Sequence, residues 1–535
     1  MTKDIIYQDP QSLLSRVSIT SLSQFIGNER SLWLNEMGVS IDQASLAALS
    51  IVESGIGFLE VEQVRNEILF SLGFDTKVIE SFKDFKIGRN KTTEKLLEIL
   101  QISPALLPPK SIKKTAVVPI TSNKCLFPYQ NWMRKSINQF LRDPEKKRAI
   151  VHMPTGSGKT RTSMEAIIDF MRNLCETRVS IFWVAHSEEL CEQAFEQLVS
   201  LWGKHATEEA HVIRLWGGNT HVAIEEDKPN FVITSFQTIH SMLSSQNDHH
   251  FKKITSLQRK NALLVVDEAH QSTAATYQSV IQFLTNHQSK VLGLTATPGR
   301  DDLKGKGHAT QELAEFYEYN KLNIVDDVGN ELDDPIKYLQ DKDILAPVER
   351  IKLQTDTYIQ LTPSERLKIE RSLEIPDSVL KKLSQDSHRT NLIVVQTMIL
   401  AVERKLQTIV FAASKQNAID LAVLLQLRGC SASAITDDSS DRALSISKFK
   451  NNEIKVLTNY GVLSTGFDAP NIGAVVIARP TLSVVLYSQM LGRGLRGKLM
   501  GGLPSCVLLD VIDNIDNMPN SEQAFTYFDN HYKGD

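Results

Sequence analysis

One stretch of the chain combines glycine, lysine and threonine at a spacing that could bind a phosphate chain. It is Met153-Pro154-Thr155-Gly156-Ser157-Gly158-Lys159-Thr160, and it follows the apolar run 149–151. Apolar residues at helical spacing come after it, so the order is strand, glycine-rich loop and helix, as phosphate-binding loops require. The glycines let successive backbone N–H groups point at an anion, and the positive end of the helix adds to them. Lys159 would then reach the β- and γ-phosphates, and the Thr160 hydroxyl would ligate Mg²⁺.

The octamer departs from the general pattern GxxxxGK[ST] at its first position, where Met153 stands in place of glycine. On these residues alone, an ordinary glycine–serine turn before a helix remains an alternative. If the loop binds phosphates, its contacts come from Thr155, Gly156, Ser157, Gly158, Lys159 and Thr160.

A pair of carboxylates supplies the second half of the expected chemistry. Asp267-Glu268-Ala269-His270 follows directly after the run Leu-Leu-Val-Val, which has the composition of a buried strand. Asp267 could hold Mg²⁺ through its water shell, and Glu268 could orient or deprotonate an attacking water. Hydrolysis of a phosphoanhydride needs both roles. An acidic N-cap for the next helix is the alternative, but the two motifs support each other.

The segments around these motifs alternate between strand and helix character. From about residue 121 to 300, buried strands are predicted at 149–151, 181–184, 231–233, 263–266 and 291–294. From about 391 to 515, strands are predicted at 408–411, 432–435, 456–457, 474–477 and 506–509. Such alternation indicates an α/β fold with two parallel sheets covered by helices, and ligands bind these sheets at the carboxyl ends of strands. The second sheet has no glycine loop, so we expect one nucleotide site, in the cleft between the two domains.

The remaining segments predict an accessory region and connections. Residues 1 to about 100 have helical spacing and no catalytic cluster, and prolines with lysines near 104–114 indicate a linker. We interpret the helical region as a partner-docking domain, with a nucleic-acid-binding module as the alternative. The segment 355–390 is polar with helical character. The predicted domains are 1–115 (helical accessory domain), 116–300 (first parallel-sheet domain), 301–350 (a charged, irregular connecting segment) and 351–535 (second parallel-sheet domain).

With these motifs in place, the chain resembles the superfamily 2 helicases and translocases. Asp267–His270 is similar to their DEAH-box signature, and Met153–Thr160 to their variant phosphate loop (Walker A), which often lacks the first glycine. Phe127–Gln130 resembles their adenine-reading segment, with Gln130 as the hydrogen-bonding residue. The resemblance implies two tandem RecA-like domains with a helical N-terminal domain, and ATP and Mg²⁺ as cofactors. The motif style is most similar to the motor type found in restriction and DNA-repair complexes.

Three shorter segments of the first domain fit the same resemblance. Val184–Ser187 is similar to motif Ia, Thr234–Thr238 to a strand-binding motif, and Thr295–Pro298 to motif III. The resemblance assigns coupling or nucleic-acid-binding roles to four residues, His270, Ser235, Thr295 and Thr297.

The second domain carries two further motifs. Gly461–Pro470 resembles motif V, which implies that Gly466 and Asp468 face the nucleotide. Gln489–Arg496 matches motif VI, QxxGRxxR, without a departure. Hydrolysis spreads negative charge over the transferring phosphoryl group, and a guanidinium can meet that charge bidentately. The candidate catalytic residues are therefore Lys159, Glu268, Gln489, Arg493 and Arg496.

Composition restricts the class of protein and its location. The net charge of −4 provides no global positive field, although a basic channel can lie on an acidic protein. The five cysteines include no CxxC pair, which predicts neither a zinc site nor a disulfide framework and favours a reducing compartment. No apolar run has membrane-spanning length and the start lacks a signal-peptide core, so we expect a cytoplasmic protein with no membrane partner.

Together these observations predict an ATP-dependent nucleic-acid motor, and the resemblance favours double-stranded DNA over RNA. No nuclease motif is present, so we expect a protein partner to supply nuclease or target-recognition activity within a DNA-repair or antiviral-defence complex. Two alternatives stay open. One is an RNA helicase or remodeller, and the other is an ATP-gated switch that controls a partner without translocation.

Overall fold

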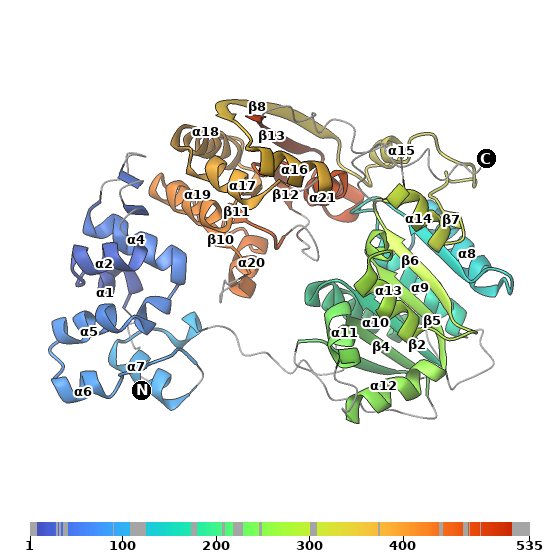
Figure 1. Cartoon of the computed structure of the whole chain (residues 1–535), viewed down its shortest axis with the longest axis horizontal. Coiled ribbons are helices and arrows are strands. Elements are labelled where there is room, and N and C mark those ends of the chain that lie inside the picture. Colours follow the sequence, from blue (N-terminus) through green and yellow to red (C-terminus); the bar gives the residue numbers. More distant parts are fainter. Residues whose placement is uncertain are drawn as a thin grey trace.

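The computed structural model contains two parallel sheets and a separate group of N-terminal helices (Figure 1). It describes residues 8–27, 30–31, 34–35, 41–88, 90–107, 125–172, 179–205, 209–217, 228–244, 249–299, 308–372, 375–437, 442–463, 469, 471–481 and 483–515. Among these residues no helix is long and apolar enough to cross a membrane. The same described part of the chain holds no cluster of three or more His, Cys, Asp or Glu side chains suited to a metal ion.

The first lobe is built on a seven-stranded sheet in the order β3-β4-β2-β5-β6-β1-β7, with every pair parallel. Its strands are β1 (Arg148–His152), β2 (Ser180–Ala185), β3 (His211–Leu215), β4 (Asn230–Ser235), β5 (Asn261–Asp267), β6 (Lys290–Thr295) and β7 (Lys321–Leu322). The five predicted strands are confirmed to within two residues at each end, because their apolar side chains are buried on both faces. The two edge strands, β3 and β7, were not predicted.

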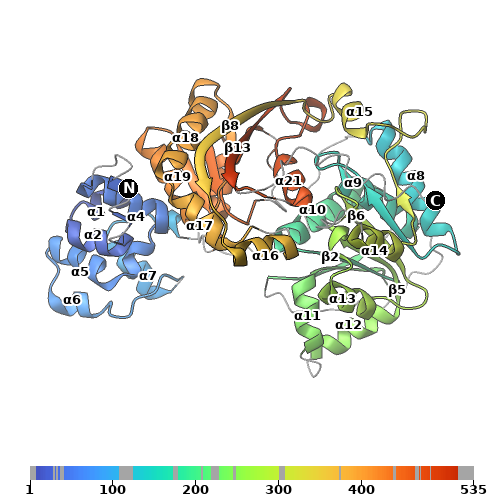
Figure 2. The same cartoon turned by 45° about the horizontal axis from the view of Figure 1, so that its top comes forward.

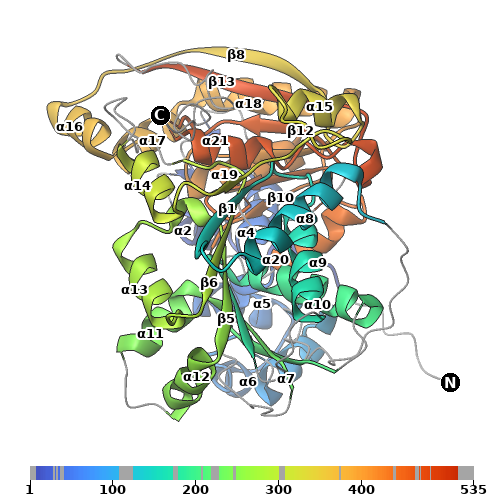
Figure 3. The same cartoon turned by 90° about the vertical axis from the view of Figure 1, so that its right-hand side faces the viewer.

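Helices cover both faces of this sheet, as Figure 3 shows. One face is covered by α8 (Pro128–Arg142), α9 (Lys159–Arg172) and α10 (Glu188–His205), and the other by α11 (Phe236–Ser244), α12 (His249–Arg259), α13 (Ala275–Leu284) and α14 (His308–Phe316). Successive strand residues point to opposite faces, so Trp183 packs with the first group of helices and Phe182 with the second. The predicted α/β class with a parallel sheet is confirmed.

The second lobe is built on a six-stranded sheet in the order β10-β11-β9-β12-β13-β8, again with every pair parallel. Its strands are β8 (Val348–Ile359), β9 (Gln407–Phe411), β10 (Ala432–Ile435), β11 (Val456–Asn459), β12 (Ile472–Ile477) and β13 (Cys506–Ile515). Its helices are α16 (Pro363–Ser372), α17 (Asp377–Gln385), α18 (Ser387–Met398), α19 (Lys415–Leu427), α20 (Arg442–Lys450) and α21 (Val484–Leu491). All five predicted strands are present, and each begins within two residues of the prediction.

The segment expected to be an irregular connection, 301–350, contains ordered elements instead. Its described part comprises α14, β7, α15 (Pro335–Asp341) and the start of β8. β7 extends the first sheet and β8 the second, so the segment contributes to both lobes. In β8, half-buried Ile351 and Leu353 alternate with exposed Lys352 and Gln354. That alternation is the pattern of a half-exposed edge strand, but its polar residues interrupt the apolar run by which the other strands were recognised.

The N-terminal region is helical, as predicted. Its helices are α1 (Pro10–Leu14), α2 (Ile19–Ile26), α4 (Gln43–Ser54), α5 (Glu62–Ser71), α6 (Thr76–Glu80) and α7 (Lys91–Ile99). Polar residues begin most of them by accepting a first-turn backbone N–H, which satisfies donors that a helix start leaves open. Leu22, Phe58 and Ile68 are fully buried in the shared core. These helices lie beside α19 of the second lobe (Figures 1 and 2), and Val423 of α19 belongs to the same core.

Candidate functional site

The predicted phosphate loop joins the end of β1 to the start of α9, at the carboxyl edge of the first sheet. Gly156 and Gly158 both have a φ of +86°, a region that glycine enters freely and other residues avoid. The carbonyl oxygen of Ser157, between them, accepts hydrogen bonds from the Tyr129 hydroxyl at 2.7 Å and from Gln130 Nε2 at 2.9 Å. Helix α8 therefore fixes the backbone of the loop through two side chains.

The Gln130 side chain is buried beneath the loop and binds backbone groups at both ends. Its Oε1 accepts the Phe127 N–H at 3.0 Å, and its Nε2 donates to Ser157. A Cβ at Gly158 would collide with Nε2, so this position needs glycine for its close approach as well as for its φ. The side chain that we expected to bind adenine thus holds the loop.

Lys159 and Asp267 form a buried pair at the base of the loop. Their Nζ and Oδ1 atoms are 3.9 Å apart, and the side chains are 13% and 4% exposed. Asp267 ends β5, and β6 lies between β5 and β1, so the carboxylate and the loop share one edge of the sheet. Burial raises the pKa of Asp267 to about 6, although the charge of Lys159 acts to lower it. The carboxylate therefore lacks sufficient positive charge around it, which is what a divalent cation would supply.

Glu268 has an unusual backbone conformation, with a φ of +53°. A non-glycine residue in this region costs free energy, and such residues gather at functional sites. Its N–H donates to Asp267 Oδ1 at 3.1 Å. Burial alone would raise the pKa of Glu268, but the charge of Lys159, with those of His270 and Arg493, holds it below its usual value. Glu268 is therefore ionised, the form that can accept a proton from water.

His270 lies between Glu268 and the segment that follows β6. Its Nδ1 is 3.3 Å from Glu268 Oε2 and 3.4 Å from Thr295 Oγ1. The Thr295 hydroxyl donates to the Thr297 carbonyl at 2.8 Å and accepts the Thr297 N–H at 3.1 Å. Three of the four candidate coupling residues, His270, Thr295 and Thr297, are thus in one hydrogen-bonded group with the candidate base.

The segment after α21 brings the second lobe directly against the phosphate loop. A Cβ at Gly492 would be 2.5 Å from Thr155 Cβ, so no larger residue fits between the lobes here. Arg496 Cγ lies 3.6 Å from the position of a Cβ on Gly156. Gln489, one turn earlier on α21, is 9% exposed. The short segment after α21 that contacts the loop therefore carries two of the three motif VI candidates, Arg493 and Arg496.

A second stretch, residues 343–346, holds this arginine segment in place. Leu345 and Arg496 form an antiparallel bridge, and Ala346 N–H donates to the Leu495 carbonyl at 2.8 Å. The Gly497 N–H donates to Ile344 at 2.9 Å, and a Cβ at Gly497 would collide with the backbone of this stretch. The motif VI segment is thus anchored to the chain that leaves α15 and enters β8.

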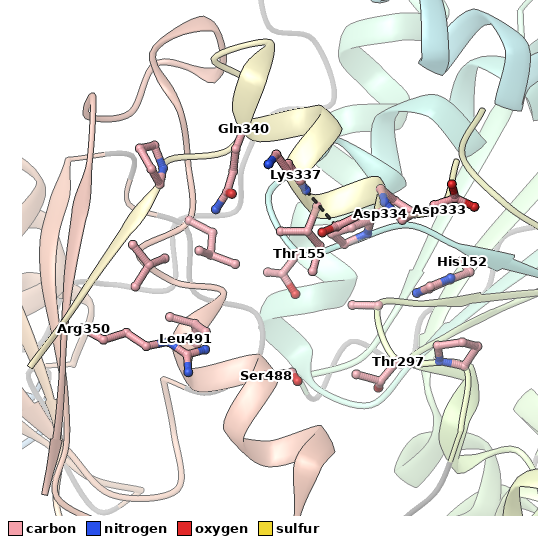
Figure 4. A pocket seen from close by; sticks show the side chains of 18 residues that line it. His152, Thr155, Thr297, Asp333, Asp334, Lys337, Gln340, Arg350, Ser488 and Leu491 are labelled. Carbon is pink, nitrogen blue, oxygen red and sulfur yellow. Dashed lines mark hydrogen bonds between the residues drawn. The ribbon is translucent and has the colours of Figure 1, made fainter. Parts of the chain in front are cut away.

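A cavity of about 420 Å³ lies beside the loop, between the lobes (Figure 4). Thr155 and Thr297 line it from the first lobe, and Ser488 and Leu491 line it from α21. α15 covers another side, as the labelled Lys337 and neighbouring residues show in the same figure. The lobes therefore touch at the loop and leave open volume next to that contact.

Ser235, the fourth coupling candidate, is not part of this cluster. The Ser235 hydroxyl lies 2.9 Å from Thr238 Oγ1 at the start of α11, two strands away from β5 in the sheet. Gly466 and Asp468 lie outside the described residues. Thr160 is half-buried in the first turn of α9, next to Lys159.

The residues present fit Mg²⁺ and a nucleoside triphosphate. A loop with two glycines at positive φ can turn its N–H groups to phosphate oxygens, and Lys159 is the cation beside it. Asp267 and Thr160 would hold the metal ion, which supplies positive charge between phosphate oxygens. Sequence analysis assigned no role to Tyr129, although it lies in the segment Phe127–Gln130, and did not single out the 343–346 stretch. The roles of both come from contacts with distant segments, which no local pattern shows.

Two regions of the chain match known domain families. Residues 123–300 match the family described as type III restriction enzyme, res subunit, and residues 390–498 match the helicase conserved C-terminal domain. The first region contains the phosphate loop and both carboxylates, and the second contains the motif VI arginines. These two matches correspond to the two lobes.

Two curated proteins are similar to this chain. The chain is 27% identical over 375 residues to the putative ATP-dependent helicase IRC3 of Saccharomyces cerevisiae, covering 68% of this chain and 48% of that protein. It is 28% identical over 399 residues to the putative mitochondrial ATP-dependent helicase irc3 of Schizosaccharomyces pombe, covering 73% of this chain and 58% of that protein. This chain spans about half the length of these relatives.

A solved structure supports the fold. The ATP-dependent Type ISP restriction-modification enzyme LlaBIII bound to DNA superposes with a TM-score of 0.50 at 14% identity, covering 79% of this chain and 30% of that one. At this level of identity the likeness concerns the fold alone, and it agrees with two parallel-sheet lobes.

Proposed function

We propose that this chain, a superfamily 2 helicase by its two matched domains, hydrolyses ATP between its lobes and uses lobe closure to move along double-stranded DNA. The DEAH-box subtype, suggested by Asp267–His270, is part of this proposal. So are the predicted domains 1–115, 116–300 and 351–535, with 301–350 contributing β7 to the first lobe and the start of β8 to the second.

The observation that carries the proposal is the meeting of two lobes at one loop. Lys159, Asp267 and Glu268 belong to the first lobe, and Arg496 approaches the loop from the second. Arg493, also from the second lobe, contributes to the low pKa of Glu268. Neither lobe has the complete set alone. A site of this kind works only while the lobes are together, so hydrolysis and lobe movement depend on each other.

Each residue of this set has a chemical role in ATP hydrolysis. Asp267 and Thr160 would hold Mg²⁺, which would supply positive charge to the phosphates. Ionised Glu268 accepts a proton from the attacking water. Arg493 and Arg496 meet the charge that develops on the transferring phosphoryl group, where guanidinium binds oxygen pairs well. Lys159 positions the terminal phosphates.

Duplex DNA is the proposed track, and the match of residues 123–300 to the family described as type III restriction enzyme, res subunit, supports this choice. Most of the affinity should come from backbone phosphates, so binding should weaken steeply with salt and depend little on sequence. With no nuclease motif in the sequence, cutting or target recognition would come from a protein partner, in a repair or anti-foreign-DNA complex. The N-terminal helices are the proposed docking domain.

Steady-state ATPase assays with duplex DNA, single-stranded DNA and RNA test the proposal. We expect duplex DNA to give the largest stimulation, Lys159→Ala to abolish hydrolysis, and Glu268→Gln to retain ATP binding while it stops turnover. Stimulation by RNA alone would contradict the choice of DNA.

A triplex-displacement assay tests movement separately. The chain should displace a third strand from duplex DNA in the presence of ATP, and Glu268→Gln should not. DNA-stimulated hydrolysis without displacement would replace the motor by an ATP-gated switch.

A further inference from the structure

Three neighbouring strands of the first sheet end at the same level. β2 lies between β4 and β5, and Ala185 at the end of β2 is paired with Ser235 at the end of β4. On the other side, Val184 is paired with Val266, one residue before the end of β5. The residue that follows each strand therefore emerges at one height along the carboxyl edge.

Those three residues are Phe236, His186 and Glu268, which we call the edge row. His186 is in the middle, between the candidate base and the first residue of α11. The row thus connects the nucleotide site to the segment 235–238, which the resemblance associates with nucleic acid. His186 itself lies in the segment similar to motif Ia.

Tyr277 of α13 lies across this row. Its hydroxyl is hydrogen-bonded to His186 Nδ1, and the two rings are stacked at 6.2 Å with an interplanar angle of 14°. Its ring also contacts Phe236, with centroids 4.0 Å apart. One tyrosine side chain therefore touches two of the three members of the row.

His186 is held from the α11 side as well. The exposed Gln237 side chain donates from Nε2 to the His186 carbonyl at 3.0 Å. A displacement of α11 or of segment 235–238 would consequently move both the backbone and the ring environment of His186. His186 is therefore hydrogen-bonded to α13 through its ring and to α11 through its carbonyl, so a shift of either helix would affect it.

Electrostatics link His186 and Tyr277 to Glu268. Burial lowers the pKa of His186, and the Glu268 charge opposes that change. Burial raises the pKa of Tyr277 to about 12, and the same carboxylate adds to the rise. In turn His186 is among the groups that lower the pKa of Glu268. The charge of Glu268 therefore affects the pKa of both His186 and Tyr277, and His186 affects that of Glu268.

We propose that Tyr277 is a positioning residue that, through His186, transmits occupancy of the nucleic-acid-binding segment 235–238 to the orientation of Glu268. The inference rests on the proposed function and specifies how nucleic acid stimulates hydrolysis at that site. Tyr277 touches neither nucleotide nor nucleic acid in this role; it acts on the base through the histidine.

Tyr277→Phe tests the link because it keeps the ring against Phe236 and removes only the hydroxyl. We expect the DNA-stimulated kcat to fall about three- to tenfold, the range that one lost hydrogen bond allows. KM for ATP and Kd for a duplex oligonucleotide should remain within about twofold of wild type, since no ligand contact is removed.

The matched control is Tyr319→Phe, between α14 and β7. Tyr319 also donates its hydroxyl to a side chain, Glu315, at 3.4 Å, and it lies just before β7, at the amino end of the strands and not at the carboxyl edge that carries the edge row. It should leave the stimulated kcat unchanged. If Tyr277→Phe does not fold, Gln237→Ala removes the other anchor of His186 from an exposed position and should lower the stimulated kcat in the same direction.

The outcomes separate the link from the proposed function. A wild-type stimulated kcat in Tyr277→Phe, or a fall matched by an equal loss of DNA affinity, would overturn the link while leaving the ATPase intact. A wild-type protein that no nucleic acid stimulates would instead overturn the proposed function itself.

Discussion

The second lobe makes two contacts of different character. Toward the first lobe it meets the phosphate loop through glycines, beside a cavity of about 420 Å³. An ion pair between Arg442 and Glu189 spans the same lobes at 3.0 Å, with side chains 26% and 38% exposed. Such a contact gains little from burial, since surface ion pairs contribute at most about 1 kcal/mol.

Toward the N-terminal helices the contact is closed. Val423 of α19 is part of their apolar core, and α4 packs on α19. Arg30 donates from Nε at 3.0 Å and Nη2 at 2.7 Å to Asp420 Oδ1, with the two side chains 12% and 6% exposed. Burial raises the pKa of Asp420 and Arg30 acts against it, so the carboxylate depends on its partner.

The difference between these two contacts indicates which parts of the molecule move together. Both contacts include buried apolar side chains, since the core of the first lobe continues into Leu491 and Leu495 of the second. The contact with the N-terminal helices adds a buried ion pair that is costly to break, whereas the contact at the phosphate loop lies beside open volume, where the lobes can separate and reform. The N-terminal helices precede the first lobe in sequence, yet they should travel with the second. Nucleotide-driven closure would then carry any docked partner with it.

The largest effect should come from removing the arginine that completes the first contact. Arg493→Ala should lower kcat about 10³-fold, as loss of an arginine finger does, with an unchanged melting temperature. Arg428→Ala in the same lobe is the control, because Arg428 pairs with Asn391 at the surface. A wild-type rate in Arg493→Ala would show that the lobe contact is not part of the site.

The second contact is tested by Asp420→Ala, which leaves Arg30 without its carboxylate. The free energy that holds the N-terminal helices should fall by about 3 kcal/mol, the lower end for a broken buried pair. Hydrogen exchange of α2 and α4 amides measures it. Lys86→Ala, in an ion pair whose lysine is 79% exposed, should change it by less than about 0.5 kcal/mol. Equal effects of the two variants would remove the contrast between the contacts.

Gly492→Ala should prevent full closure of the lobes. The Gly492 backbone, at φ −55° and ψ −17°, accepts alanine, so only the 2.5 Å approach to Thr155 opposes it. A steric cost of about 1–3 kcal/mol predicts a fall in kcat of about five- to 150-fold. The melting temperature should not change. A variant that loses stability but not activity would mean that this contact is structural and permanent.

The pH dependence of Mg²⁺ binding tests the role of Asp267, which lies beside the phosphate loop at the first contact. Since the pKa of Asp267 is raised to about 6, the carboxylate becomes protonated as pH falls through that value. Metal ligands must be deprotonated, so apparent Mg²⁺ affinity should fall about tenfold per unit below about pH 6. Titration of Mg²⁺ in ATPase assays between pH 5 and pH 8 measures it. A flat profile would exclude Asp267 as the metal-holding carboxylate.

Sequence was sufficient where the information is local. Ten buried strands were predicted because each is a short apolar run, and their alternation with helices indicated two parallel sheets. The loop at Met153–Thr160 and the carboxylates Asp267 and Glu268 were recognisable because their chemistry depends on spacing along the chain. The edge strand β8 was missed although Ile351, Leu353 and Thr355 alternate with polar residues, since its outer face is exposed.

Only the tertiary structure decided how distant segments meet. No spacing rule predicts that Gln130 holds Ser157, that Leu345 pairs with Arg496, or that Tyr277 crosses the edge row. Nor does sequence order indicate that the N-terminal helices pack on α19 beyond the first lobe. These contacts join residues separated by tens to hundreds of positions, and their geometry follows from sheet order and helix packing. The sequence by itself determined the chemical groups, and the packing of the lobes decided which of them act together.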